Sequence, residues 1–177
     1  MADLLVAQLG NPVLRNKANR VTNLLDKNIQ NLIDDMLNIV VDKKGVGIAA
    51  PQISQPFQIF IMASYPNDRY PNAPKMRATA IINPKIIWKS KETVKDWEGC
   101  LSVPSIRGLV SRHRSIKVKY LTRDNQTVET EYNDFLARIF QHEIDHLNGI
   151  VFVDRVDSTL DLIAESEWKT QILGRTP

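Results

Sequence analysis

The chain has 177 residues, of which 43% are hydrophobic and 24% are charged, and its formal net charge is +3. These values are typical of one globular domain over residues 1–177 and argue against a disordered, collagen-like or coiled-coil chain. No stretch holds the roughly 20 apolar residues that cross a bilayer, and residues 1–10 lack the basic start of a signal peptide. We therefore expect a cytoplasmic protein without membrane contact. The single cysteine, Cys100, excludes an internal disulfide.

The first half of the chain predicts one helix, one strand and one long loop. Apolar side chains recur at helical spacing over residues 24–41, beginning with Leu25, and Gly45 marks the end of this helix. Residues 57–62 have the apolar character of a buried strand. Residues 64–76 are rich in proline and asparagine, which predicts an irregular surface loop.

Strands dominate the middle of the chain. Alternating hydrophobicity and turn residues predict them at 78–88 with a break at Asn83-Pro84, at 107–110, at 116–122 and at 127–132. They precede a helix over residues 134–147 and a C-terminal helical tail within 156–177, which we place at 159–173. This order predicts an α+β fold, in which mostly antiparallel strands pack around the helix of residues 134–147.

The strongest chemical signal lies on that helix, where residues 142–146 read HEIDH. Positions i and i+4 of a helix share a face, so His142 and His146 can bind one metal ion. Glu143 then lies beside the metal as a candidate general base. The alternative is that both histidines are ordinary surface residues.

A catalytic metal site needs a third protein ligand. Cys100 is one candidate; it lies between Gly99 and Pro104, which suggests a tight irregular segment rather than a core strand. A thiolate would suit iron, zinc, cobalt or nickel. The other candidates are carboxylates downstream of the helix, namely Asp154, Asp157, Asp161, Glu165 and Glu167.

Residues 45–52 read GVGIAAPQ and match the dinucleotide-binding pattern G-x-G-x-x-A. That pattern requires a strand before it and a helix after it. Here a predicted helix precedes it and Pro51 follows, which argues against a nucleotide site. The glycines instead allow close approach of the backbone to a ligand, with the Gln52 amide at the end of the segment.

Three segments together resemble peptide deformylase. They are the glycine-rich stretch ending in Gln52, the EGCLS of residues 98–102 and the HEIDH of residues 142–146. The resemblance implies removal of the formyl group from the N-terminal formylmethionine of nascent proteins. It also implies one divalent metal ion held by Cys100, His142 and His146, Fe²⁺ in the cell and Zn²⁺, Ni²⁺ or Co²⁺ in purified protein.

The resemblance also implies roles for the surrounding residues. Glu143 would act as general base and then general acid, while the Gln52 side chain and the Leu101 backbone N–H would stabilise the developing oxyanion. The backbone of Gly45, Val46 and Gly47 would pair with the peptide in β-strand fashion.

The helix of residues 134–147 supplies candidates for the methionine pocket. We expect Phe135 and Ile139 as pocket walls with Arg138 at the rim; the alternative for these side chains is plain helix packing. By analogy with the family, Glu98 would pair with Arg112 and fix the segment that carries Cys100.

We expect formylmethionyl peptides as substrates, no DNA, and transient ribosome contact through the segment from Thr159, including Trp168 and Lys169. One rival is a zinc protease that uses a carboxylate or histidine in place of Cys100. The other is a basic adaptor on ribosomal RNA with a structural metal, for which His113, otherwise an exposed strand histidine, is the one unassigned histidine.

Overall fold

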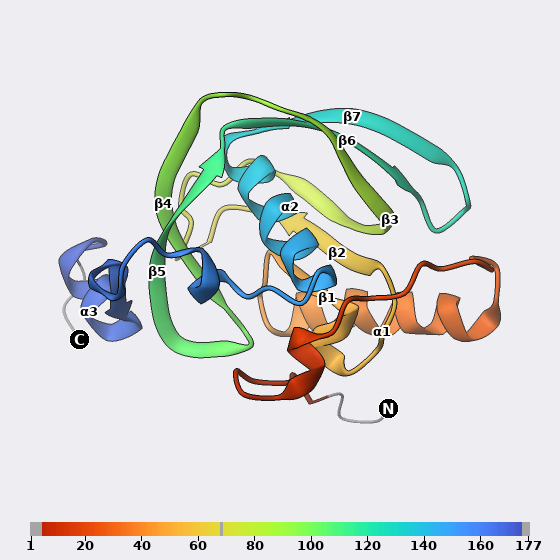
Figure 1. Cartoon of the computed structure of the whole chain (residues 1–177), viewed down its shortest axis with the longest axis horizontal. Helices are drawn as coiled ribbons and strands as arrows, with labels where there is room; N and C mark the ends of the chain where they lie inside the picture. The colour runs from red at the N-terminus through yellow and green to blue at the C-terminus, as the bar shows by residue number, and fades with distance from the viewer. Residues whose placement is uncertain (1–4, 68, 175–177) are drawn as a thin grey trace.

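The structure is a computed structural model that describes residues 5–67 and 69–174. It confirms the α+β fold, with two antiparallel sheets (Figure 1). The first sheet has the order β1-β2-β3-β6-β7, formed by Gly47–Ala49, Ile59–Ser64, Met76–Lys89, Ser115–Leu121 and Thr127–Asn133. The second has the order β4-β5-β8, formed by Thr93–Cys100, Val103–His113 and Leu162–Ala164. The helices are α1 (Lys27–Asp42), α2 (Asp134–Leu147) and α3 (Glu165–Gln171).

Strand β2 shows how the layers are held together, because it is buried on both faces. Successive side chains of a strand point to opposite sides. Ile59 and Ile61 belong to the apolar cluster that includes α1, whereas Phe60 and Met62 belong to the cluster that includes α2. The large sheet therefore lies between the two helices. The other side of α2 meets β5, so α2 is the central element, as expected.

Helix α1 begins later than the hydrophobic pattern predicts. Asp26 is its N-cap, and the Asp26 side chain accepts a hydrogen bond of 2.8 Å from the backbone N–H of Asn28. This is the usual role of Asp at a helix start. Leu25 therefore precedes the helix and is 69% exposed, so its assignment to the apolar face was wrong. Leu32 and its neighbours on the inward face are buried.

The predicted strands are present, and the break at Asn83 is confirmed as an irregularity within one long strand. Asn83 has a φ of +49°, and the register between β3 and β6 shifts between Ile82 and Lys85. The Asn83 side chain exchanges two hydrogen bonds of 2.9 Å with the backbone of Val21. The described residues between β2 and β3, 65–67 and 69–75, form an irregular loop, as predicted.

The segment around Cys100 differs from the expectation. Glu98, Gly99 and Cys100 end strand β4, which pairs with an extended β5. The irregular features are a register shift between Gly99 and Cys100, a turn at residues 101–102 and a φ of +62° at Ser105. The first four side chains of β4, Thr93 to Asp96, are exposed, and all of them except Val94 are polar. Such a strand lacks the alternating pattern that reveals strands in a sequence, because its pairing with β5 is what fixes it.

The C-terminal tail is helical only in part, which corrects the helix predicted over residues 159–173. Strand β8 interrupts it, and β8 pairs with β5 through Ile106, Arg107 and Gly108. Within residues 156–174, only α3 is α-helical, although a 3-10 turn covers Thr159–Asp161. Residues 162–164 therefore form a strand because they pair with the edge of β5, although the local sequence pattern favours a helix. Within the described residues, none of the helices has the length and apolar character needed to cross a membrane.

Truncation of Leu32 tests the packing of α1. We expect Leu32→Ala to lower the free energy of unfolding by about 2–4 kcal/mol, because the buried side chain leaves a cavity under the helix. The same truncation at the exposed Leu25 should change it by less than about 0.5 kcal/mol. Urea unfolding followed by circular dichroism measures both. Equal losses in the two variants would contradict the placement of the helix start.

Candidate metal centre and cleft

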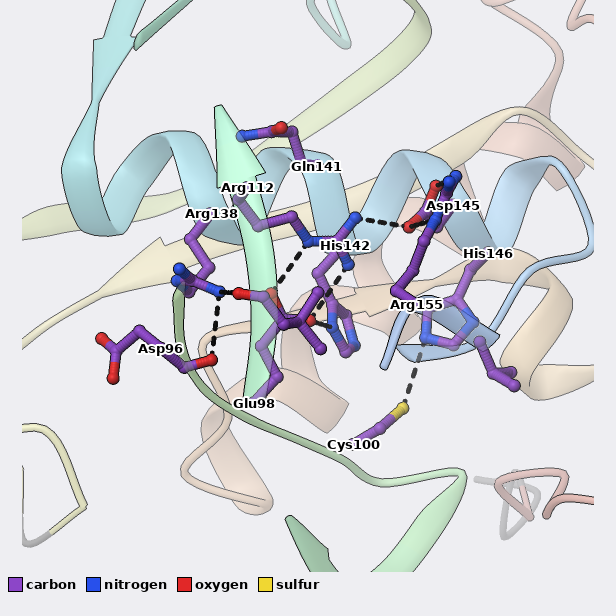
Figure 2. Close-up of polar contacts among 12 residues, drawn as sticks. Asp96, Glu98, Cys100, Arg112, Arg138, Gln141, His142, Asp145, His146 and Arg155 are labelled. Atoms are coloured by element: carbon purple, nitrogen blue, oxygen red, sulfur yellow. Dashed lines mark hydrogen bonds and ion pairs between the residues drawn. The ribbon is translucent and has the colours of Figure 1, made fainter. Parts of the chain in front are cut away.

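Helix α2 and the end of β4 bring three potential metal ligands together. One ligand atom each from Cys100, His142 and His146 lies within 4.8 Å of the other two. The Sγ atom of Cys100 is 3.3 Å from Nε2 of His146 (Figure 2). His146 is 1% exposed, which is incompatible with an ordinary surface histidine. This group joins residues that are more than forty positions apart in the sequence.

The carboxylate of Glu98 is buried behind this group and has three partners. It accepts hydrogen bonds of 2.9 and 3.0 Å from Nε and Nη2 of Arg112. It accepts two further bonds of 2.9 Å, from Nη1 of Arg138 and from Nδ1 of His142 (Figure 2). Burial raises the pKa of a carboxyl group, but the bonds from His142 and Arg112 outweigh it and hold the pKa of Glu98 below its usual range. Glu98 is therefore an anion that orients the ring of His142.

A second buried carboxylate, Asp145, extends the network along α2. Nη1 of Arg112 donates a bond of 2.6 Å to Asp145. Arg155 donates two more, of 3.0 and 2.6 Å, from Nε and Nη2. Arg112 thus bridges the two acids, and the arrangement ties α2 to the β4–β5 hairpin (Figure 2).

The sequence predicted Arg138 at the rim of the pocket, and the structure corrects this prediction. It is 7% exposed, and besides Glu98 it donates to the carbonyls of Val110, at 2.8 Å, and Val94, at 2.6 Å. A buried guanidinium needs several acceptors, and β4 and β5 provide them. Arg138 therefore anchors α2 to the small sheet.

Glu143 lies on the cleft side of α2 and is 4% exposed. Burial raises the pKa of Glu143 to about 7, although the charges of His142 and His146 oppose the rise. Nothing among the described residues bonds its Oε2 atom. A Cβ atom on Gly47 would lie 2.2 Å from Oε1 of Glu143, so Gly47 lets β1 pass this side chain. A Cβ atom on Gly45 would meet none of the described atoms closer than 3.7 Å, so the packing of the protein itself does not require glycine there.

Gln52 is oriented by two sets of contacts. Its Oε1 accepts a bond of 2.8 Å from the backbone N–H of Ala49. Its Nε2 donates to Oγ of Ser102 at 3.0 Å and to Sγ of Cys100 at 3.3 Å. The amide donor is therefore held against the cysteine. Leu101 follows Cys100 in the turn between β4 and β5 and also lines the cleft.

The surroundings of Cys100 favour the ionised form of its thiol. Burial alone raises the pKa of a thiol, but the charge of His146 and hydrogen bonding to both histidines lower the pKa of Cys100 well below its ordinary value. The pKa of His142 moves oppositely: burial lowers it, but bonds to Cys100 and Glu98 raise it well above its ordinary value. The sulfur therefore has the electrostatic setting of a thiolate ligand.

A cavity of about 280 Å³ opens in front of these groups. Most of the residues predicted for the site line it: Gly45, Val46, Gly47, Gln52, Glu98, Cys100, Leu101, Phe135, Arg138, Ile139, His142 and Glu143. Ile139 also belongs to the core cluster of the large sheet, so its side chain both packs in the core and lines the cavity. Arg112 and His146 lie behind the wall. The sequence missed Arg69, Tyr70, Trp97 and Arg107, which come from separate segments without a shared pattern, and it offered Glu165 only as a candidate metal ligand.

The downstream carboxylates considered as third ligands are mostly engaged elsewhere. Asp154 pairs with Arg15, Lys95 pairs with both Asp157 and Asp161, and Glu165 pairs with Arg107. His113 is half-buried rather than exposed, and its Nδ1 lies 2.7 Å from the carbonyl of Ser90. Among the described residues, Cys100 is the third member of the histidine group.

Comparisons with known proteins agree on one family. The family model described as polypeptide deformylase matches residues 4–161. A Nostoc sp. protein named peptide deformylase 2 is 53% identical over 97% of this chain and 96% of its own length. A Shewanella oneidensis protein of the same name is 41% identical over 94% of this chain and 91% of its own.

Solved structures give the same result. A class I type b peptide deformylase from Acinetobacter baumannii with Met-Ala-Ser bound aligns with a TM-score of 0.85 and 46% identity over 88% of this chain and all of that chain. The peptide deformylase of Thermotoga maritima aligns with a TM-score of 0.77 and 37% identity over 86% of this chain and 97% of that chain.

Removal of Arg112 tests the buried network. We expect Arg112→Met to lower the free energy of unfolding by about 3–5 kcal/mol, because Glu98 and Asp145 would lose a shared buried partner. Arg114→Met removes a neighbouring arginine whose pairs with Glu92 and Asp134 are exposed, and it should leave the midpoint of urea unfolding unchanged. If both variants unfolded at the wild-type midpoint, the network would have no structural importance.

Proposed function

The chain belongs to the polypeptide deformylase family, and from this premise we propose that Cys100, His142 and His146 hold the metal with which it hydrolyses formylmethionyl peptides. Members of this family are enzymes that remove the N-formyl group from nascent peptides. The observation that carries the proposal is the meeting of these three side chains beside the buried Glu143, at the base of an open cleft.

The donor set of the cluster suits the proposed metal. Two imidazoles and one thiolate favour iron, zinc, cobalt or nickel, and we propose Fe²⁺ in the cell. Nδ1 of His142 is hydrogen-bonded to the carboxylate of Glu98, which leaves Nε2 of that ring as the ligand atom. When bound, the metal ion would act as a Lewis acid and would bring the pKa of a water molecule near neutrality.

Glu143 is the proposed carrier of the proton. Its pKa of about 7 lets it accept a proton from the attacking water and later release it near neutral pH. The amide bond between the formyl carbon and the methionine nitrogen breaks. The proton then passes from Glu143 to that nitrogen, and the products are formate and a free N-terminal amine.

Two donors are proposed for the oxygen of the formyl group. Nε2 of Gln52 is oriented toward Cys100 because Ala49 fixes the other end of the amide. The backbone N–H of Leu101 follows Cys100 directly in the chain. Preorganised donors of this kind stabilise the negative charge that develops in the transition state.

The edge of the large sheet is the proposed peptide-binding strand. β1 is one of the two edge strands of that sheet, and Gly45, Val46 and Gly47 line the cleft at its start. A peptide that pairs with this edge is bound by its main chain, so varied sequences after the methionine are accepted. Phe135 and Ile139 on α2 provide an apolar wall for the methionine side chain.

Transient ribosome contact through the segment from Thr159 stays a prediction. Trp168 is 4% exposed, which corrects its assignment to that surface. Lys169 remains an exposed candidate.

Replacement of Glu143 tests the proton carrier. We expect Glu143→Gln to lower kcat for formate release from formyl-Met-Ala-Ser by about 10²–10⁴-fold, because the amide cannot accept the proton. Its metal content, assayed anaerobically on the same sample, should equal that of the wild type. Glu129→Gln, on the exposed face of β7, serves as the matched control. Full activity of the Glu143 variant would exclude this mechanism.

Replacement of Cys100 separates the proposal from a protease with a carboxylate ligand. We expect Cys100→Ala to lose its stoichiometric metal, since two imidazoles alone hold it weakly. Elemental analysis after gel filtration measures the metal-to-protein ratio, and circular dichroism checks the fold. Retention of one metal per chain would favour the protease instead.

A further inference from the structure

The outer end of the cleft is organised around a buried arginine, Arg107, which is 3% exposed. Its Nη1 donates a bond of 3.0 Å to the hydroxyl of Tyr70, in the loop between β2 and β3. Its Nη2 donates a bond of 2.8 Å to Oε1 of Glu165, at the start of α3. The guanidinium carbon lies 4.5 Å from the ring centroid of Trp168. Two distant segments, the β2–β3 loop and α3, therefore meet on this cation of β5.

This cation lies close to the proposed metal centre. Gly99 pairs with Arg107 across β4 and β5, and a Cβ atom on Gly99 would lie 2.8 Å from Cζ of Arg107. The Arg107 side chain therefore crosses the backbone one residue before Cys100. On the other side, the ring of Tyr70 packs 4.8 Å from that of Phe135, a wall of the proposed methionine pocket.

The position of Glu165 is fixed by backbone pairing. β8 places Ile163 opposite Arg107 and Ala164 opposite Ile106, and Glu165 follows directly. Glu165 lines the same cleft as Cys100 and Glu143. Glu165 therefore adds one side chain of α3 to the wall of the cleft, and α3 itself lies at the outside of the fold (Figure 1).

The charge balance at this end of the cleft depends on Glu165. Two arginines line it, Arg107 and Arg69, and Arg69 is held by a bond of 2.7 Å to the carbonyl of Lys44. The hydrogen bond from Arg107 lowers the pKa of Glu165, so this carboxyl group is ionised at neutral pH. Without it, this part of the wall would present two cations and would attract an acidic side chain.

We propose that Glu165 is a specificity-determining residue: by pairing with Arg107, it prevents the cleft from favouring peptides with an acidic residue after the formylmethionine. This inference rests on the proposed function and extends it to the residues downstream of the scissile group. A broadly acting processing enzyme needs such neutrality, since an unpaired arginine beside the substrate would select by charge.

The test compares formyl-Met-Ala-X amides in which X is Glu, Gln or Lys, with formyl-Met-X-Ala amides as a second set. We expect Glu165→Gln to raise kcat/KM for X = Glu, relative to X = Gln, by about five- to tenfold. The change should lie in KM, because a group remote from the formyl carbon binds ground state and transition state alike. It should shrink with added salt.

Two control variants distinguish an effect of the Glu165 charge from a structural effect of the substitution. Glu165→Asp keeps the carboxylate and should keep the wild-type preference. Glu167→Gln removes an exposed acid from the same helix and should also keep it. The proposal is overturned if Glu165→Gln has the wild-type preference, or if it loses kcat equally for all peptides. A wild-type enzyme that releases formate from none of them would instead overturn the proposed function.

Discussion

The buried carboxylate of Glu98 is the constraint on which the site depends. An anion out of water is costly unless every oxygen is well partnered. Its partners are Arg112 from β5 and Arg138 and His142 from α2. The small sheet and the central helix must therefore dock in one register. That register carries Cys100, two residues further along β4, to the two histidines.

Stability and geometry come from different parts of the molecule. The large sheet is packed on both faces by α1 and α2, and the apolar side chains of β2 supply much of that contact. The other side of α2 is mainly polar, with Glu98 and Asp145 among three arginines. Apolar packing tolerates small shifts, whereas a hydrogen-bonded network specifies positions. Cys100, His142 and His146 lie on this polar side, where the geometry is most restricted.

Sequence patterns predicted the elements whose signals are local. α1 and α2 follow from helical periodicity, β2 from its apolar run, and the HEIDH residues from their spacing on one helix. β4 and β8 have no such signal because pairing with β5 determines them. Arg138 was predicted at the rim of the pocket, yet the carbonyl groups that bind it come together only in the folded hairpin. Tyr70, Arg107 and Glu165 meet only through tertiary structure.

The most direct test of this account is the metal affinity of Glu98→Gln, measured by competition with a chelator on protein whose fold is checked by circular dichroism. The amide retains the shape of the carboxylate but not the charge that orients His142. We predict a dissociation constant about 10–100-fold higher than that of the wild type. The exposed Glu92→Gln variant should match the wild type. An unchanged affinity in folded Glu98→Gln would contradict the central role of this carboxylate.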